Sequence, residues 1–126
     1  MSSEQQVSST PDGTLPAHDV VELDKILDGL VARSTEPMIV VVDGPQNESV
    51  YFGIAGRSGF VSKATEPPYC TTVGDATAEG YTAFSFEGHN TEIAKRHLIA
   101  LDLARQVVRD FFLTGSFSPL VEWEEI

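Results

Sequence analysis

Residues 38–63 have the sequence MIVVVDGPQNESVYFGIAGRSGFVSK, in which the hydrophobic pattern changes from helical spacing to short strand-like runs. Three short runs of β-branched and aromatic residues, at 38–43, 50–54 and 60–63, are separated by turn residues, which is typical of a meandering antiparallel sheet. Gly56 and Gly59 allow the positive φ angles of a tight hairpin loop. A phosphate-binding loop is not favoured here, because the Gly-Lys-Ser/Thr ending is absent and another strand follows.

The strand pattern continues towards the C-terminus. Residues 69–73 and 82–87 predict two more strands, and in the second of these large and small side chains alternate, so one face is expected to be buried. A last strand is predicted over residues 120–125. We expect its Trp123 to dock this strand against a helix rather than to contact a partner, because a large indole is mostly buried.

Two amphipathic helices flank the strands. The first begins after Asp19, whose carboxylate can cap free backbone N–H groups, and Glu22 completes a capping-box pattern. The second is predicted over residues 97–114, and Gly115 is its expected left-handed stop. The predicted fold is therefore α+β: a curved antiparallel sheet of about five to six strands with two helices packed on it, in the order αβββββαβ.

Length and composition predict one domain. A chain of 126 residues, 41% of them hydrophobic, can bury a core of its own. Residues 1–18 carry only two sizeable apolar side chains and predict a flexible N-terminal tail, which leaves a single domain at 19–126. No secretory signal or bilayer-length apolar run is visible, and the lone Cys70 agrees with a reducing compartment. We expect a cytoplasmic protein.

The charge balance favours a basic partner. Eight Lys and Arg against 19 Asp and Glu give a net charge of -11, which repels nucleic-acid phosphates and anionic membranes, so neither is an expected partner. Four of the basic residues lie at or on the second helix, which predicts an acidic sheet side and a less acidic helical side. The alternative is that the acidity only aids solubility. The candidate partner-binding residues are Asp43, Glu48, Asp75, Glu79, Glu87 and Glu92.

No motif predicts catalysis, a metal site or a cofactor. His89, Glu92 and His97 are potential metal ligands, but their spacing matches no standard zinc pattern. Cys70 could pair with either histidine, although a small buried side chain within a strand is its commoner role. An enzyme that uses His89, Glu92 or His97 remains an alternative, because sites can be assembled from residues distant in sequence.

The second half of the chain resembles a known family. Residues 84–93 (FSFEGHNTEI), 112–115 (FLTG) and 119–123 (PLVEW) are similar to immunity protein family 1 of bacterial polymorphic toxin systems. The opening helix and residues 39–42 and 51–54 agree more loosely. This resemblance implies a non-enzymatic protein that is encoded beside a toxin, often a nucleic-acid deaminase, and that binds and inactivates this toxin in the producing cell.

The charge and the resemblance lead to one hypothesis. An immunity protein would cover the substrate cleft of a basic, nucleic-acid-modifying toxin with its acidic surface. The alternative from a different class is a small-ligand or peptide-binding module without catalytic activity, whose pocket lies between the sheet and the helices.

Overall fold

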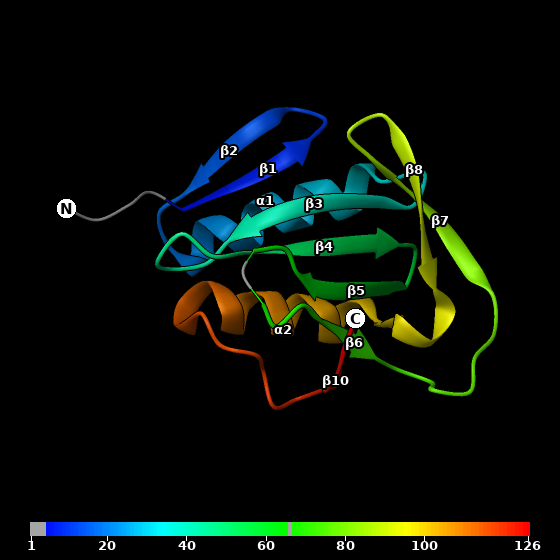
Figure 1. Cartoon of the computed structure of the whole chain (residues 1–126). Coiled ribbons are helices and arrows are strands. Elements are labelled where there is room, and N and C mark those ends of the chain that lie inside the picture. The colour runs from blue at the N-terminus through cyan, green and yellow to red at the C-terminus, as the bar shows by residue number, and fades with distance from the viewer. Residues whose placement is uncertain (1–4, 66) are drawn as a thin grey trace.

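The computed structural model describes residues 5–65 and 67–126, and Figure 1 shows their arrangement. The elements are β1 (Gln5–Thr10), β2 (Gly13–Ala17), α1 (Val20–Arg33), β3 (Met38–Asp43), β4 (Ser49–Ala55), β5 (Ser58–Lys63), β6 (Cys70–Val73), β7 (Tyr81–Phe86), β8 (His89–Ala94), a 3-10 turn η1 (Lys95–His97), β9 (Ile99–Ala100), α2 (Leu101–Thr114) and β10 (Glu122–Glu125).

The predicted α+β class is confirmed, but the predicted strand count and order are wrong in detail. In the described residues ten strands belong to one sheet, whose main path runs β10-β6-β5-β4-β3-β1-β2. The stretch from β3 to β5 forms its centre as two antiparallel hairpins. Gly56 adopts φ 63° in the tight turn between β4 and β5, as expected, whereas Gly59 lies within β5 and does not have a positive φ angle. One contact is parallel, where Met38 of β3 pairs with Ser85 of β7.

The N-terminal segment is ordered where a flexible tail was predicted. Over residues 5–17 the chain forms the β1–β2 hairpin, and β1 joins the central sheet through β3. Val7 and Ala17 are fully buried in the main core, and the Gln5 side chain donates a hydrogen bond to the Phe112 carbonyl at 2.9 Å. The central sheet gives this polar segment a strand to pair with and a core in which to bury Val7 and Ala17. The composition of the segment does not reveal either of these contacts. Residues 1–4 of the predicted tail lie outside the described residues.

The first helix begins directly after Asp19, as predicted, whereas the second begins four residues later than predicted. Asp19 accepts a hydrogen bond from the Glu22 N–H as predicted, but the Glu22 carboxylate turns back to His18 rather than to Asp19. The second helix begins at Leu101, not at residue 97, because η1 and β9 take up the preceding residues. Its first N–H is bound by the Arg57 carbonyl at 2.8 Å in place of a side-chain cap. Gly115 ends the helix at φ 75°, as predicted.

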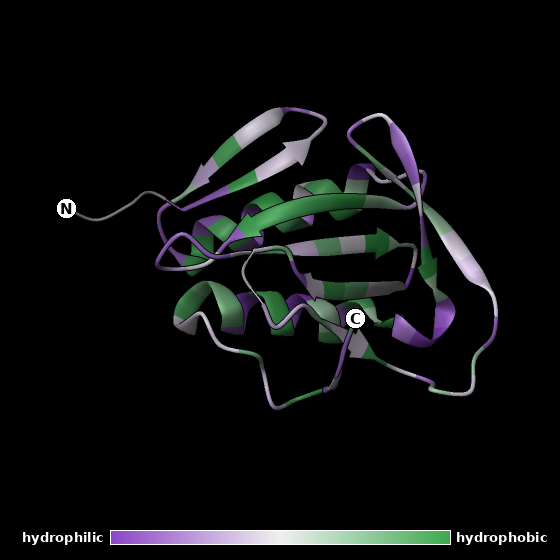
Figure 2. Ribbon diagram, viewed as in Figure 1, coloured by the Kyte–Doolittle hydropathy of each residue, from purple (hydrophilic) through white to green (hydrophobic). Residues whose placement is uncertain are grey.

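The main core lies between the sheet and the two helices, which both lie behind the sheet in Figure 1. Helix α1 contributes Leu23, Leu27 and Leu30, and α2 contributes a continuous buried stripe that includes Phe111 and Phe112. Figure 2 shows that hydrophobic residues concentrate on the central strands and on the helices. Burial of these side chains is the dominant favourable contribution to folding.

Strands β7 and β8 form a separate hairpin, which we call the β7–β8 arm (residues 81–94). It crosses the ends of β3, β4 and β5 on the face of the sheet opposite the helices (Figure 1). The arm is anchored by Phe84, which is fully buried in a second, smaller core with Ile39 and Phe60. Strand β8 was not predicted, because residues 89–94 form a short run of mostly polar side chains.

The C-terminal strand β10 pairs with β6, and it begins two residues later than predicted. Trp123 is half-buried at the edge of the main core, where its ring lies 4.7 Å from that of Phe117. Its indole N–H donates to the Ser118 carbonyl at 2.8 Å, so this side chain closes the loop between α2 and β10. Among the described residues, no helix is long and apolar enough to cross a membrane.

Candidate partner-binding surface

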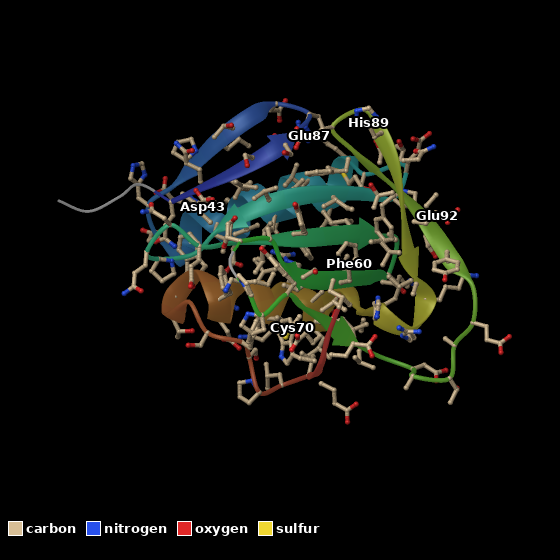
Figure 3. All side chains as sticks on the ribbon, in the orientation of Figure 1. Asp43, Phe60, Cys70, Glu87, His89 and Glu92 are labelled. Carbon is tan, nitrogen blue, oxygen red and sulfur yellow. The ribbon has the colours of Figure 1, made fainter. Side chains whose placement is uncertain are left out.

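The six acidic residues predicted to bind a partner fall in three separate places. Two lie at the turn between β3 and β4, two in the loop between β6 and β7, and two on the arm: Asp43 and Glu48, Asp75 and Glu79, Glu87 and Glu92, respectively. Strand β3 places the first pair roughly 17 Å from the point where the arm joins it, at ~3.3 Å per residue. Figure 3 shows Asp43 at the opposite end of the sheet from Glu92. The acidic residues therefore do not form one patch.

The pair at the β3–β4 turn is engaged within the protein. Asp43 is half-buried, and its Oδ2 accepts a hydrogen bond from the Gln6 N–H at 3.2 Å, which fastens β1 to the sheet. Burial raises the pKa of Asp43 above its ordinary value. Glu48 lies 3.7 Å from the Nζ of Lys63, whose side chain is only 8% exposed. Both carboxylates are therefore engaged with other groups of the protein and are less free to contact a partner.

The β6–β7 loop presents two exposed carboxylates. Asp75 orders this loop, because its Oδ1 accepts hydrogen bonds from the hydroxyl and the backbone N–H of Thr77 at 2.6 and 3.0 Å. These bonds lower the pKa of Asp75. Glu79 is exposed and has no side-chain partner among the described residues. This loop holds its charge on the surface near the base of the arm.

The arm has two distinct faces, because side chains alternate along each strand. Phe84, Phe86 and Ile93 point inwards to the sheet. The opposite side, which we call the outer face of the arm, carries small or polar residues and one aromatic residue. Its members are Tyr81, Ala83, Ser85, Asn90 and Glu92, and all of them are exposed.

Tyr81 and Glu87 mark the two ends of the arm. Tyr81 is 65% exposed, an unusual position for an aromatic side chain unless it contacts a partner. Glu87 lies in the two-residue turn at the tip with φ 50°, and its carboxylate accepts a hydrogen bond from the Ser9 hydroxyl at 3.2 Å. The tips of two hairpins that are distant in sequence are thus joined across the molecule.

Two of the basic residues predicted to make the helical side less acidic are neutralised between the helices. The Arg105 guanidinium lies 2.7 Å from an Asp28 carboxylate oxygen and donates to the Asp24 carbonyl. Arg109 Nε lies 3.4 Å from Asp24 Oδ2 but forms no well-aligned hydrogen bond. The cationic groups of α2 therefore hold α1 in place and add little free positive charge to the surface.

The candidate metal and catalytic residues are not brought together. His89 is exposed at the tip of the arm, whereas His97 is buried in η1, where its Nε2 donates to Glu124. Arg96 donates to the same carboxylate at 2.9 Å, and these two contacts lower the pKa of Glu124. Cys70 lies at the opposite end of the molecule from His89 (Figure 3). Among the described residues, no group of three His, Cys, Asp or Glu side chains could hold a metal ion.

The structure adds an apolar hollow that the sequence did not reveal. It has a volume of ≈ 310 Å³ and lies between the inner side of the arm and the open face of the central sheet, on the face opposite the predicted pocket between the sheet and the helices. Most of its lining is apolar and comes from five strands and the C-terminal residue, through Ile39, Tyr51, Phe60, Phe86, Ile93 and Ile126. In the sequence, only the alternation of Thr91 and Ile93 with polar residues could have indicated this lining. That alternation is too short to predict a strand.

A comparison with models of known protein families gives a match to the model described as Immunity protein Imm1, over residues 12–125. This match confirms the resemblance that was noted from residues 84–93, 112–115 and 119–123. No curated protein matches the chain.

Proposed function

The chain belongs to the Imm1 family of immunity proteins, and from this premise we propose that it binds a cognate bacterial toxin and neutralises it. We further propose that the toxin is a basic, nucleic-acid-targeting enzyme of the deaminase type, whose substrate cleft is covered by an acidic surface of this protein. The protein itself acts without catalysis and without a cofactor. Its site of action is the cytoplasm, where such a toxin meets its nucleic-acid substrate.

The observation that carries this proposal is the exposed acidic surface formed by the arm and the loop before it. Asp75, Glu79 and Glu92 are exposed there, and Tyr81, which follows Glu79 by two residues and shares a face of the arm with Glu92, is a solvent-exposed aromatic side chain. Charge complementarity of this kind raises the association rate, and a central aromatic residue often supplies much of the binding energy. Among the six candidate residues we therefore assign direct contact to Asp75, Glu79, Glu87 and Glu92.

The proposed mechanism is occlusion. An enzyme that acts on a nucleic-acid base needs a positively charged path for the phosphates and a pocket for the extruded base. Carboxylates on a hairpin can occupy the positions of the phosphates, while the hairpin itself fills the path. Such an inhibitor needs no reactive group, only a rigid surface of the right charge.

The decisive experiment uses the toxin domain encoded by the adjacent gene. Co-expression should rescue cells from this toxin, and calorimetry should give a tight one-to-one complex that weakens as salt is added. The double variant Glu79→Lys, Glu92→Lys should bind at least about tenfold more weakly at low salt, because both reversals replace attraction by repulsion.

The matched control is Asp102→Lys, an exposed charge reversal on the first turn of α2, in the helical layer. It should leave affinity unchanged and cost at most ~1 kcal/mol of stability through the helix dipole. Equal affinity of the double variant and the wild type would refute the acidic-surface mechanism. Absence of both rescue and complex would refute the immunity role for this gene pair.

A small-ligand or peptide-binding module is the second candidate, and the apolar hollow beneath the arm is the observation that favours it. A thermal-shift survey of small apolar molecules separates the two functions. A true ligand at 100 times its dissociation constant adds about 2.7 kcal/mol of stability, which is readily detected. A hit of this kind without any toxin rescue would favour the second candidate.

A further inference from the structure

The free edge of β8 lies beside the apolar hollow, and the two features together form a site for an extended peptide segment. The register of the arm shows which backbone groups are free. The turn at Glu87-Gly88 has two residues with positive φ angles of 50° and 82°, and Phe86 pairs with His89 across it. In such a hairpin the closing pair exchanges backbone hydrogen bonds, and bonded and non-bonded pairs then alternate.

This alternation assigns each residue of β8 to one of two groups. The backbone groups of His89, Thr91 and Ile93 form hydrogen bonds with β7. The Lys95 N–H, which donates to the Gly80 carbonyl at 3.0 Å, continues the same alternation. The N–H and C=O groups of Asn90, Glu92 and Ala94 therefore point away from β7. Strand β8 pairs only with β7 in the described part of the chain, so these groups form an open edge.

The side chains beside this edge are divided by chemistry. Thr91 and Ile93 point inwards and line the hollow together with Tyr51 and Phe60. Glu92 lies on the outer face of the arm, is exposed, and has no side-chain partner among the described residues. A strand added at this edge would therefore place one set of its side chains into the hollow and the alternate set beside the carboxylate of Glu92.

We propose that the edge of β8 binds an extended segment of the cognate toxin in which apolar and basic residues alternate. The apolar side chains enter the hollow, and the basic side chains lie beside Glu92 on the outer face of the arm. This inference rests on the proposed function, because the segment belongs to the toxin, and it names the chemistry of the contact.

The charge of the protein argues against a second copy of this chain as the occupant. Two β8 edges paired antiparallel about Glu92 would bring like charges face to face, which is destabilising. Each copy also carries a net charge of -11, which adds repulsion over the whole surface. A basic strand gains from the same charges. No Lys or Arg lines the hollow in the described residues, so nothing there repels it.

A peptide tests the contact without the toxin. The probe is acetyl-Arg-Val-Arg-Phe-Arg-Val-amide, and its controls are the same peptide with Glu in place of Arg and one with N-methylated backbone amides at alternate positions. Titration should shift the methyl resonances of Ile39 and Ile93 and protect the amides of Asn90, Glu92 and Ala94 from exchange. Both controls should fail, because one repels Glu92 and the other cannot pair with an edge.

A proline substitution tests the edge itself. Ala94 already has φ -60°, which is compatible with proline, so Ala94→Pro removes only an outward N–H. Its matched control is Ala94→Ser, which keeps the N–H. We expect Ala94→Pro to weaken the binding of the probe peptide and of the toxin domain by about fivefold, with Ala94→Ser unchanged.

The outcomes separate this inference from the proposed function. Rescue and tight toxin binding by wild type and Ala94→Pro alike would overturn the edge contact and leave the immunity role intact. Absence of toxin binding by the wild type would refute the immunity role, whatever the peptide does. Equal binding of the probe and its N-methylated control, or self-association of the protein through β8, would overturn the inference on its own terms.

Discussion

Phe84→Ala is expected to release the β7–β8 arm while the rest of the domain stays folded. Phe84 is 0% exposed, and its ring meets that of Phe60 edge-on, with centroids 5.2 Å apart. The truncation removes about 100 Å² of buried apolar surface, or roughly 2.5 kcal/mol, and an edge-to-face contact of about 1 kcal/mol. The sum of about 3.5 kcal/mol agrees with the ~3–5 kcal/mol typical of Phe→Ala changes.

The loss should be local because Phe84 is the only fully buried side chain among the described residues of the arm, while Phe86 and Ile93 are only partly buried. The backbone of the arm joins β3 through one pair, Met38 with Ser85, and through the Ser85 N–H, which donates to the Pro37 carbonyl at 2.8 Å. An isolated hairpin is at best marginally stable in water. A loss of about 3.5 kcal/mol corresponds to a ~300-fold rise in the open population of the arm.

Amide hydrogen exchange followed residue by residue measures this population. In Phe84→Ala, protection should fall in residues 81–94 and persist in β4 and β5. Leu27→Ala is the control, because Leu27 is fully buried in the main core and its truncation should lower protection in β4 and β5 as well. Equal loss of protection in β4, β5 and the arm of Phe84→Ala would refute the local anchoring, and so would an unchanged arm.

Three further outcomes are expected. Gly59→Ala should cost at least ~1–3 kcal/mol in urea unfolding, because a Cβ there would lie 2.5 Å from the Gly53 carbonyl oxygen; a neutral effect would contradict this close approach. The pKa of Glu124 is lowered chiefly by its bond from His97, so Glu124→Gln should be less stable than wild type at pH 7. This difference should fade as the pH falls from the ordinary carboxyl value of 4.5 through the lowered pKa, and a constant difference would contradict the bond. Burial raises the pKa of Asp43, so its charged form destabilises the fold above that raised pKa, and Asp43→Asn should melt higher than wild type at pH 7. Thermal melts should show this gain disappearing below the ordinary value of 3.8, and a lower melting temperature at pH 7 would contradict the desolvation.

Local signals predicted the elements whose stability is encoded nearby in the chain. Residues 38–43 form β3 with the predicted bounds, Asp19 caps α1, and Gly115 ends α2 in the left-handed conformation. Each of these depends on residues within about one turn or one hairpin. The family resemblance was carried in the same way, by short runs of residues in the second half of the chain.

The elements that the sequence missed obtain part of their stability from the central sheet, whose residues lie far from them in the sequence. Residues 5–17 carry few apolar side chains, and they are ordered by backbone pairing with β3 and by burial of Val7. Residues 89–94 become a strand because β7 offers them a partner and the sheet covers Ile93. The contacts with the central sheet join residues that are far apart in the sequence, and they offset the entropy cost of closing the intervening loops. No local sequence pattern reveals such contacts.

The α+β class, the start of the first helix, the end of the second, the acidic charge and the family all follow from the sequence alone. The net charge is a sum over residues and can be calculated without a structure. The position of each carboxylate can be known only from the structure. The tertiary structure is needed to see that Asp43 and Glu48 bind within the fold while Glu79 and Glu92 face outwards, because burial depends on what packs against each side chain. It also shows that the arm lies over Ile39 and Phe60, and this packing forms both the hollow and the free edge beside it.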